Sequence, residues 1–202
     1  MILLTTKSLD MIAANPNTGM LFTPNRRKCN PEPYALAGIP FAADNDCYNG
    51  GLDAPAWVKM LADLMGYDPL FVVCPDVVGS HALTLQEWDW WSGTIHACGF
   101  RAAFVLQDGI LSWAEVPADA DAVFVGGTDA FKFSQTSRCI VAKAKAHGRY
   151  VHIGRVNSLR RIADANAMGA DSFDGSSVSK WWDVYAKRFA TAASQPPQGM
   201  LA

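Results

Sequence analysis

The chain has 202 residues, half of them hydrophobic, and a formal net charge of −2. This length predicts one domain with a sizeable core. The near-neutral charge excludes a general electrostatic attraction to nucleic acids, so a polyanionic partner would have to bind a local basic patch. No apolar run approaches the roughly 20 residues of a membrane helix, and no basic segment precedes the short apolar N-terminal run, so we expect a cytoplasmic protein.

The N-terminal part of the chain holds two short apolar runs. The first, at residues 1–5, is expected to be a strand, with a short helix at residues 7–14 and a second apolar run at residues 20–23. Residues 24–33 contain three prolines and the adjacent cations Arg26, Arg27 and Lys28. Because proline disrupts helix interiors and central strands, this segment is expected to be a loop.

From residue 39 onward, short apolar segments alternate regularly with amphipathic ones. Strands are expected at residues 39–43, 70–74, 102–106, 122–125, 150–153 and 170–173. After the first of these, Asp53 and Gly66 predict the start and the end of a helix that buries Trp57, Leu61, Leu64 and Met65. The next helix is expected to bury Ala82, Leu85, Trp88, Trp91 and Ile95.

The C-terminal half continues the same alternation. We expect a short helix at residues 112–116, one longer helix that ends near His147, a helix with Leu159, Ile162, Ala163 and Asn166 on one face, and a last helix from residue 179. Short buried strands that alternate with helices predict a parallel sheet. Six such units and two N-terminal apolar runs predict a small TIM-like (β/α)8 barrel over residues 1–193, with a flexible tail at 194–202. An open doubly wound sheet is the alternative, but its GxGxxG fingerprint is absent.

A parallel barrel gathers the carboxyl ends of its strands at one mouth. Those ends supply three carboxylates, one amide, two glycines and one arginine, namely Asp44, Asp76, Asp174, Gln107, Gly126, Gly127 and Arg155. Buried carboxylates cost free energy unless they have partners, so three at one mouth indicate chemistry. One carboxylate can attack the anomeric carbon of a glycosidic bond while another handles the leaving-group proton. A third carboxylate with an amide can read a purine edge, and glycines leave room for a flat base.

In this order, the strand-end motifs resemble those of the tRNA-guanine transglycosylase superfamily (queuine tRNA-ribosyltransferase-like), and specifically its small phage-type members that act on DNA. The resemblance covers roughly residues 41–180 and is carried by FAADND (41–46), CPDVVGS (74–80), FVLQDG (104–109), FVGG (124–127), VHIGRVNS (151–158) and GADSFDG (169–175). It implies a pentosyltransferase that exchanges guanine for a 7-deazaguanine base in DNA through a covalent glycosyl-enzyme.

The resemblance also implies roles for individual residues. Asp174 matches the nucleophile and Asp44 the general acid/base. The base-reading side chains correspond to Asp76 and Gln107, and the backbone of the base pocket corresponds to Gly126 and Gly127.

Three departures from the family pattern are visible. The tRNA enzymes carry a Cys-rich zinc segment after the nucleophile, which has no counterpart here and which weakens the case for a tRNA substrate. The family motif DSGGFQ is here ADNDCYNG (43–50), so Asp46 is a rival to Asp44. Asp108 stands where the tRNA enzymes have glycine.

Since the five cysteines and four histidines are widely spaced, with no CxxC or HxxxH, we expect reduced thiols, no metal and no cofactor.

A DNA substrate would be held through its phosphates, and its target base would be extruded from the duplex. The expected nucleic-acid contacts are Arg155, Arg160, Arg161, Lys180 and His152, and the cations at 26–28 are additional candidates. A solvated helix face explains Arg160 and Arg161 equally well, and His152 could be a packed strand residue. Three functional alternatives stay open: exchange in tRNA, hydrolysis that releases the base to water, and a non-catalytic DNA-binding module on the same fold.

Overall fold

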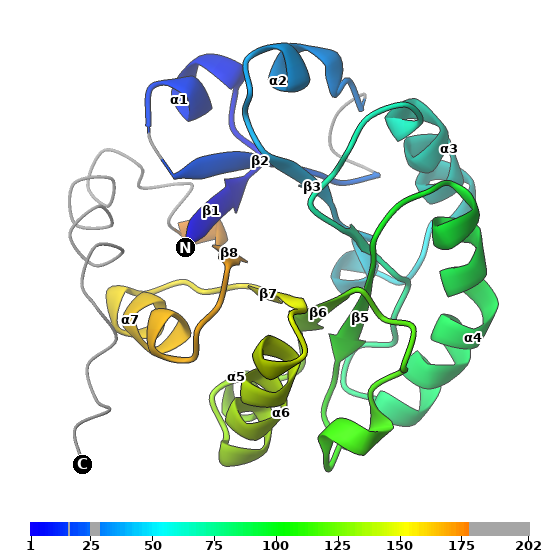
Figure 1. Cartoon of the computed structure of the whole chain (residues 1–202), viewed down its shortest axis with the longest axis vertical. Coiled ribbons are helices and arrows are strands. Elements are labelled where there is room, and N and C mark those ends of the chain that lie inside the picture. The colour runs from blue at the N-terminus through cyan, green and yellow to red at the C-terminus, as the bar shows by residue number, and fades with distance from the viewer. Residues whose placement is uncertain (16, 25–28, 178–202) are drawn as a thin grey trace.

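The computed structural model describes residues 1–15, 17–24 and 29–177 of the chain, which form a closed barrel (Figure 1). Within this described part, eight parallel strands pair in sequential order, and β8 pairs back to β1. The strands are β1 (Ile2–Thr5), β2 (Thr18–Phe22), β3 (Phe41–Ala43), β4 (Val72–Val73), β5 (Ala102–Leu106), β6 (Ala122–Val125), β7 (Tyr150–Ile153) and β8 (Ser172–Asp174). The predicted TIM-like (β/α)8 fold is therefore confirmed.

Helices surround the barrel on its outer side (Figure 1). They are α1 (Leu9–Ala13), α2 (Glu32–Leu36), α3 (Ala54–Leu64), α4 (His81–Ala97), α5 (Asp129–Lys132), α6 (Gln135–Ala146) and α7 (Leu159–Ala167), with 3-10 turns η1 (Cys47–Asn49) and η2 (Trp113–Glu115). Because α1, α2 and α5 span only one turn or slightly more, the barrel closes within a short chain. No helix in the described ranges is long and apolar enough to cross a membrane. The last expected helix, the tail, Lys180 and the cations at 26–28 lie outside the described residues.

The strands separate two layers of packing because their side chains alternate between the barrel interior and the helices. The interior layer contains Leu4, Leu21, Ala42, Phe71, Val73, Ala103, Val105 and Ala122. The larger outer layer joins the strands to the helices and includes the fully buried Trp57 of α3. Its indole ring packs edge-on against Trp91 of α4, with ring centroids 5.4 Å apart.

Several expectations about the helices were wrong in detail. Helix α2 was not expected, yet it forms because prolines are tolerated in a first turn, where backbone N–H groups lack helical acceptors. One long helix was expected where the structure has α5 and α6. Ser134 separates these two helices, and its hydroxyl accepts a hydrogen bond from the backbone N–H of Ser137 at 3.2 Å.

The buried faces of three helices also differ from expectation. Met65 follows the end of α3 and is 53% exposed, and Ala82 and Ala163 are exposed. Helix α4 instead buries the polar Thr84, whose hydroxyl donates to the Ser80 carbonyl at 2.8 Å. A pattern that counts only apolar residues misses such a position, because a satisfied hydroxyl is buried at little cost.

Candidate active site at the barrel mouth

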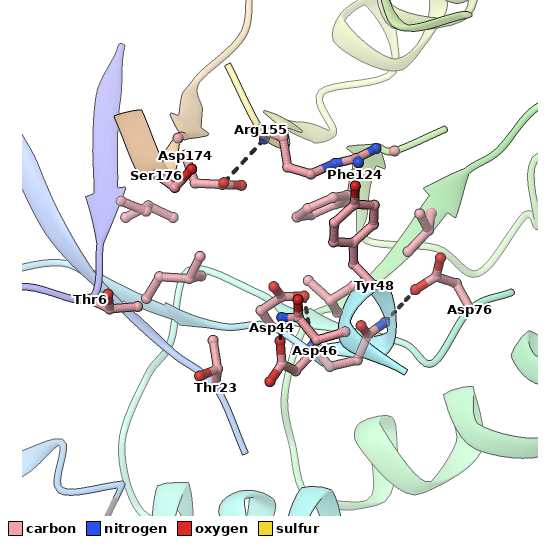
Figure 2. A pocket seen from close by; sticks show the side chains of 18 of the residues that line it. Thr6, Thr23, Asp44, Asp46, Tyr48, Asp76, Phe124, Arg155, Asp174 and Ser176 are labelled. Atoms are coloured by element: carbon pink, nitrogen blue, oxygen red, sulfur yellow. Dashed lines mark hydrogen bonds between the residues drawn. The ribbon is translucent and has the colours of Figure 1, made fainter. Parts of the chain in front are cut away.

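A cavity of about 540 Å³ opens at the carboxyl ends of the strands. Its floor consists of interior side chains that include Leu4, Leu21, Val73, Val105 and Phe124. Its walls bring together all seven residues expected at the strand ends, Asp44, Asp76, Gln107, Gly126, Gly127, Arg155 and Asp174. Figure 2 shows Asp174 and Asp44 on opposite sides of this cavity, with open space between them.

Asp174 is the last residue of β8, with β1 on one side of it and β7 on the other. Its Oδ1 accepts a hydrogen bond from the backbone N–H of Arg155 at 3.1 Å. Its Oδ2 lies 3.0 Å from Nε2 of His152. Each oxygen therefore has a fixed partner, which sets the plane of the carboxylate, while 19% of the side chain remains exposed to the cavity.

Asp44 directly follows β3 and is partly buried. Its Oδ1 accepts a hydrogen bond from the backbone N–H of Asn45 at 2.8 Å. Burial, and to a smaller extent the charges of Asp174 and Asp76, raise the pKa of the Asp44 carboxyl from 3.8 to about 7. At neutral pH this group is therefore divided between its protonated and ionised forms, as a residue that both gives and takes a proton must be.

Asp46 is the rival acid/base residue, and it lies in a different local setting. It has a left-handed backbone (φ 59°), is 7% exposed and precedes η1. Its carboxylate accepts a hydrogen bond from the side-chain amide of Asn49. Both Asp44 and Asp46 line the cavity, and the charges of Asp174 and Asp76 act to raise the pKa of Asp44.

Asp76 is held by two amide groups. Asn45 donates to its Oδ1 at 2.7 Å, and Gln107 donates to its Oδ2 at 2.6 Å. Burial raises the pKa of Asp76, and these hydrogen bonds and the charge of Arg155 act against that rise. Gln107 also accepts a hydrogen bond from the backbone N–H of Gly79 at 2.9 Å. The amide of Gln107 therefore positions Asp76, which lines the cavity.

The loop after β6 approaches the neighbouring strand closely. A Cβ atom on Gly126 would lie 2.8 Å from Val105 Cγ1 and 2.9 Å from Gln107 Nε2, so a side chain there would displace the amide that holds Asp76. Asp108 anchors the same loop, since its two carboxylate oxygens accept hydrogen bonds from the backbone N–H and the hydroxyl of Thr128, each at 2.7 Å. Asp108 therefore has a structural role in the loop after β6.

Arg155 reaches across the mouth from the end of β7. Its backbone is left-handed (φ 57°), and its guanidinium donates a hydrogen bond to the carbonyl of Gly127. The same guanidinium stacks over the ring of Tyr48, 3.9 Å from the ring centroid (Figure 2). Tyr48 is 59% exposed. The Arg155–Tyr48 pair thus forms part of the rim.

The remaining nucleic-acid candidates separate into different environments. His152 is 1% exposed inside the barrel, so it cannot reach a DNA backbone, and that expectation was wrong because His152 belongs to the inward-facing row of β7. Arg160 is exposed, whereas Arg161 forms a 2.8 Å ion pair with Asp129. Another cation, Lys132 of α5, was not a candidate. Its side chain is fully buried, and burial and the charge of Arg155 lower its pKa.

Asn45, Tyr48 and Lys7 are among the cavity-wall residues that were not anticipated from the sequence. Asn45 and Tyr48 follow Asp44 closely in the sequence, and this proximity to a candidate residue could have indicated that they also line the cavity. Lys7 follows β1 and also lines the cavity. In the described ranges, no hydrogen bond or ion pair involves the ammonium group of Lys7. Nor do these ranges contain a cluster of three or more His, Cys, Asp or Glu side chains that could hold a metal ion.

The fold and the site together define a (β/α)8 barrel protein with a carboxylate-lined cavity at the end of the barrel where such folds hold their active sites. No family model matches the chain, and no curated protein is similar to it. A chain in the crystal structure of the Amycolatopsis orientalis BexX/CysO complex is similar in structure, with 15% identity and a TM-score of 0.61 over 100% of this chain and 94% of that chain. At this identity, the similarity shows the fold alone.

Proposed function

We propose that this protein exchanges guanine for a 7-deazaguanine base in DNA through a covalent intermediate on Asp174. One observation carries the proposal: Asp44 and Asp174 face one shared cavity, in which burial and the charges of Asp174 and Asp76 raise the pKa of Asp44 to about 7. Base exchange needs a fixed nucleophile on one side of a sugar and a group that can donate and later accept a proton on the other side. The strand-end motifs, which resemble those of small phage-type transglycosylases, support the same reaction.

The first step breaks the bond between C1′ of the target nucleotide and N9 of guanine. A carboxylate oxygen of Asp174 supplies the electron pair that forms the new C1′–O bond. The electron pair of the broken bond goes to N9, which takes the proton of Asp44. The products are neutral guanine, a glycosyl ester on Asp174 and ionised Asp44, so charge and protons balance.

The second step reverses these transfers with a different base. The 7-deazaguanine gives its N9 proton to the Asp44 carboxylate, and its N9 attacks C1′. The ester bond to Asp174 breaks, and the electron pair returns to the carboxylate. Both steps use the same two aspartates, so the enzyme ends in its starting state.

Base recognition is assigned to the wall formed by Asp76, Gly126 and Gly127. A purine-like base with guanine-type N–H donors can donate to the carboxylate of Asp76, which Asn45 and Gln107 hold in place. The cavity volume of about 540 Å³ falls in the range of about 300–1,000 Å³ that small-ligand sites occupy. It holds a nucleoside but not a duplex, so the base would have to be extruded from the helix.

A DNA strand would be gripped on both sides of the nucleophile. Asp174 on β8 has β1 and β7 as its neighbours, and a cation follows each of them at the cavity wall, Lys7 after β1 and Arg155 after β7. Two cations that flank the nucleophile suit the two phosphates that flank one extruded nucleotide. This placement favours a nucleotide within a strand over a free nucleoside.

The test is incubation of the protein with duplex DNA carrying labelled deoxyguanosine and with a set of 7-deazaguanine bases, followed by nucleoside analysis. Wild type should release guanine, incorporate the new base and form an adduct with DNA that survives denaturation. Asp174→Asn should abolish all three, while Asp89→Asn, an exposed carboxylate on α4, should retain them. Full exchange by Asp174→Asn would refute the nucleophile. Base release without incorporation would indicate a hydrolase, and DNA binding without either would indicate a binding module.

A further inference from the structure

A histidine inside the barrel contacts the proposed nucleophile from below the cavity. Tyr150 and His152 on β7 alternate inward, as does Gly154 directly after that strand, and on β8 the inward residues are Ser172 and Asp174. His152 pairs with Ser172 in the strand register, is 1% exposed, and places Nε2 3.0 Å from Oδ2 of Asp174. A buried imidazole is costly unless both ring nitrogens have partners.

The other ring nitrogen and the ring itself are also in contact with neighbours. Nδ1 lies 2.8 Å from the hydroxyl of Ser172. The Phe124 ring stacks on the imidazole with centroids 4.7 Å apart, and the Phe71 ring packs against it at a tilt of 53°, with centroids 5.3 Å apart. Gly154 makes room for this stack, because a Cβ atom there would lie 2.7 Å from the Phe124 ring. The Ser172 hydroxyl can donate to Nδ1, which places the ring hydrogen on Nε2, facing Asp174.

We propose that His152 is a positioning residue that holds Asp174 and favours its release from the covalent intermediate. This inference rests on the proposed function, since it concerns the two steps through Asp174. The hydrogen bond from Nε2 meets a charged carboxylate before the first step and after the second, and an uncharged ester oxygen between them. Hydrogen bonds to charged groups are roughly twice as strong as neutral ones. The donor therefore stabilises the free carboxylate relative to the ester, so the covalent intermediate does not accumulate.

Two substitutions at the same position separate this role from simple packing. In His152→Gln, the side-chain amide nitrogen takes the place of Nε2 and can still donate to Asp174. In His152→Asn, the shorter amide takes the place of Nδ1, so it can still meet Ser172 but leaves Asp174 without a donor. Both variants carry a polar amide into the same buried site, which makes them matched controls for each other, and thermal melting should show that each is folded.

The measurements are the single-turnover rates of guanine release and of new-base incorporation, together with the fraction of protein found as the covalent adduct. We expect His152→Asn to slow incorporation about tenfold, to change guanine release less than about threefold, and to accumulate the adduct. His152→Gln should stay within about threefold of wild type in both steps. Equal losses in both steps for His152→Asn, or identical behaviour of the two variants, would overturn the proposal.

A measurement on the wild-type protein tests the geometry without any turnover. Nitrogen-15 NMR of labelled histidine should show a hydrogen on Nε2 of His152 at pH 7. An Nδ1–H tautomer with a bare Nε2 would overturn the assignment even if exchange is observed. If wild type forms no adduct and exchanges no base, the proposed function fails and the kinetic claim falls with it, whereas the NMR result still decides whether His152 positions Asp174.

Discussion

Replacement of Asp44 by asparagine should stabilise the protein at alkaline pH although it removes the proposed acid/base group. Burial and the charges of Asp174 and Asp76 raise the Asp44 pKa from 3.8 to about 7 in the folded protein, whereas in the unfolded chain the carboxyl titrates near its ordinary value. Between these two pH values the folded state binds more protons than the unfolded state. The free energy of unfolding therefore falls as the pH rises from about 4 to about 7. Asparagine is nearly isosteric and carries no charge, so it escapes this loss.

The magnitude follows from the shift of the Asp44 pKa from 3.8 to about 7. A shift of about three pKa units, at about 1.4 kcal/mol each, corresponds to about 4 kcal/mol as an upper bound at pH 8. For a domain of this size, 1 kcal/mol moves the melting temperature by about 2–4 °C. We therefore expect Asp44→Asn to melt above wild type at pH 8, by up to about 8–16 °C, with a difference that shrinks toward zero near pH 4.

The assay is denaturant unfolding of both proteins at several pH values between 4 and 8, with thermal melts alongside. Asp89→Asn serves as the control, because Asp89 is an exposed carboxylate on α4, and this variant should follow the wild-type pH dependence. An Asp44→Asn protein that is no more stable than wild type at pH 8, or whose advantage does not close on acidification, would refute the account of a desolvated carboxyl at the mouth.

Two further predictions concern catalysis and DNA binding. Because the first step needs protonated Asp44, guanine release should fall about tenfold per pH unit above about 7. Asp46→Asn should show the same decline. Asp44→Asn should show no such decline, and its rate of guanine release should be about 10²–10⁴-fold lower than that of wild type. Lys7→Gln should weaken DNA binding and reduce the slope of log affinity against log salt by about one. Lys59→Gln, which removes an exposed ion pair with Asp63 on α3, should leave that slope unchanged, and equal slopes for both variants would remove Lys7 from the phosphate contacts.

Local patterns in the sequence were sufficient for the strands that the barrel buries on both faces. β5, β6 and β7 lie at the expected residues, because continuous apolar runs bounded by turn residues are typical of buried parallel strands. The expected strand at 70–74 shortens to Val72–Val73, and β8 starts at Ser172 and takes in Asp174. Strand ends depend on which partner carbonyls are within reach, and that information is not local.

The amino-acid sequence by itself determined the alternation of strands and helices, and so the (β/α)8 class and the set of side chains that end at one mouth. Only the tertiary structure decided what those side chains do there. In the structure, the Gln107 amide donates a hydrogen bond to Asp76, His152 is buried beneath Asp174, and Lys7 lies at the cavity wall. The physical reason is that hydrogen-bond partners and burial come from strands far apart in the chain, and their side chains meet only when the barrel closes.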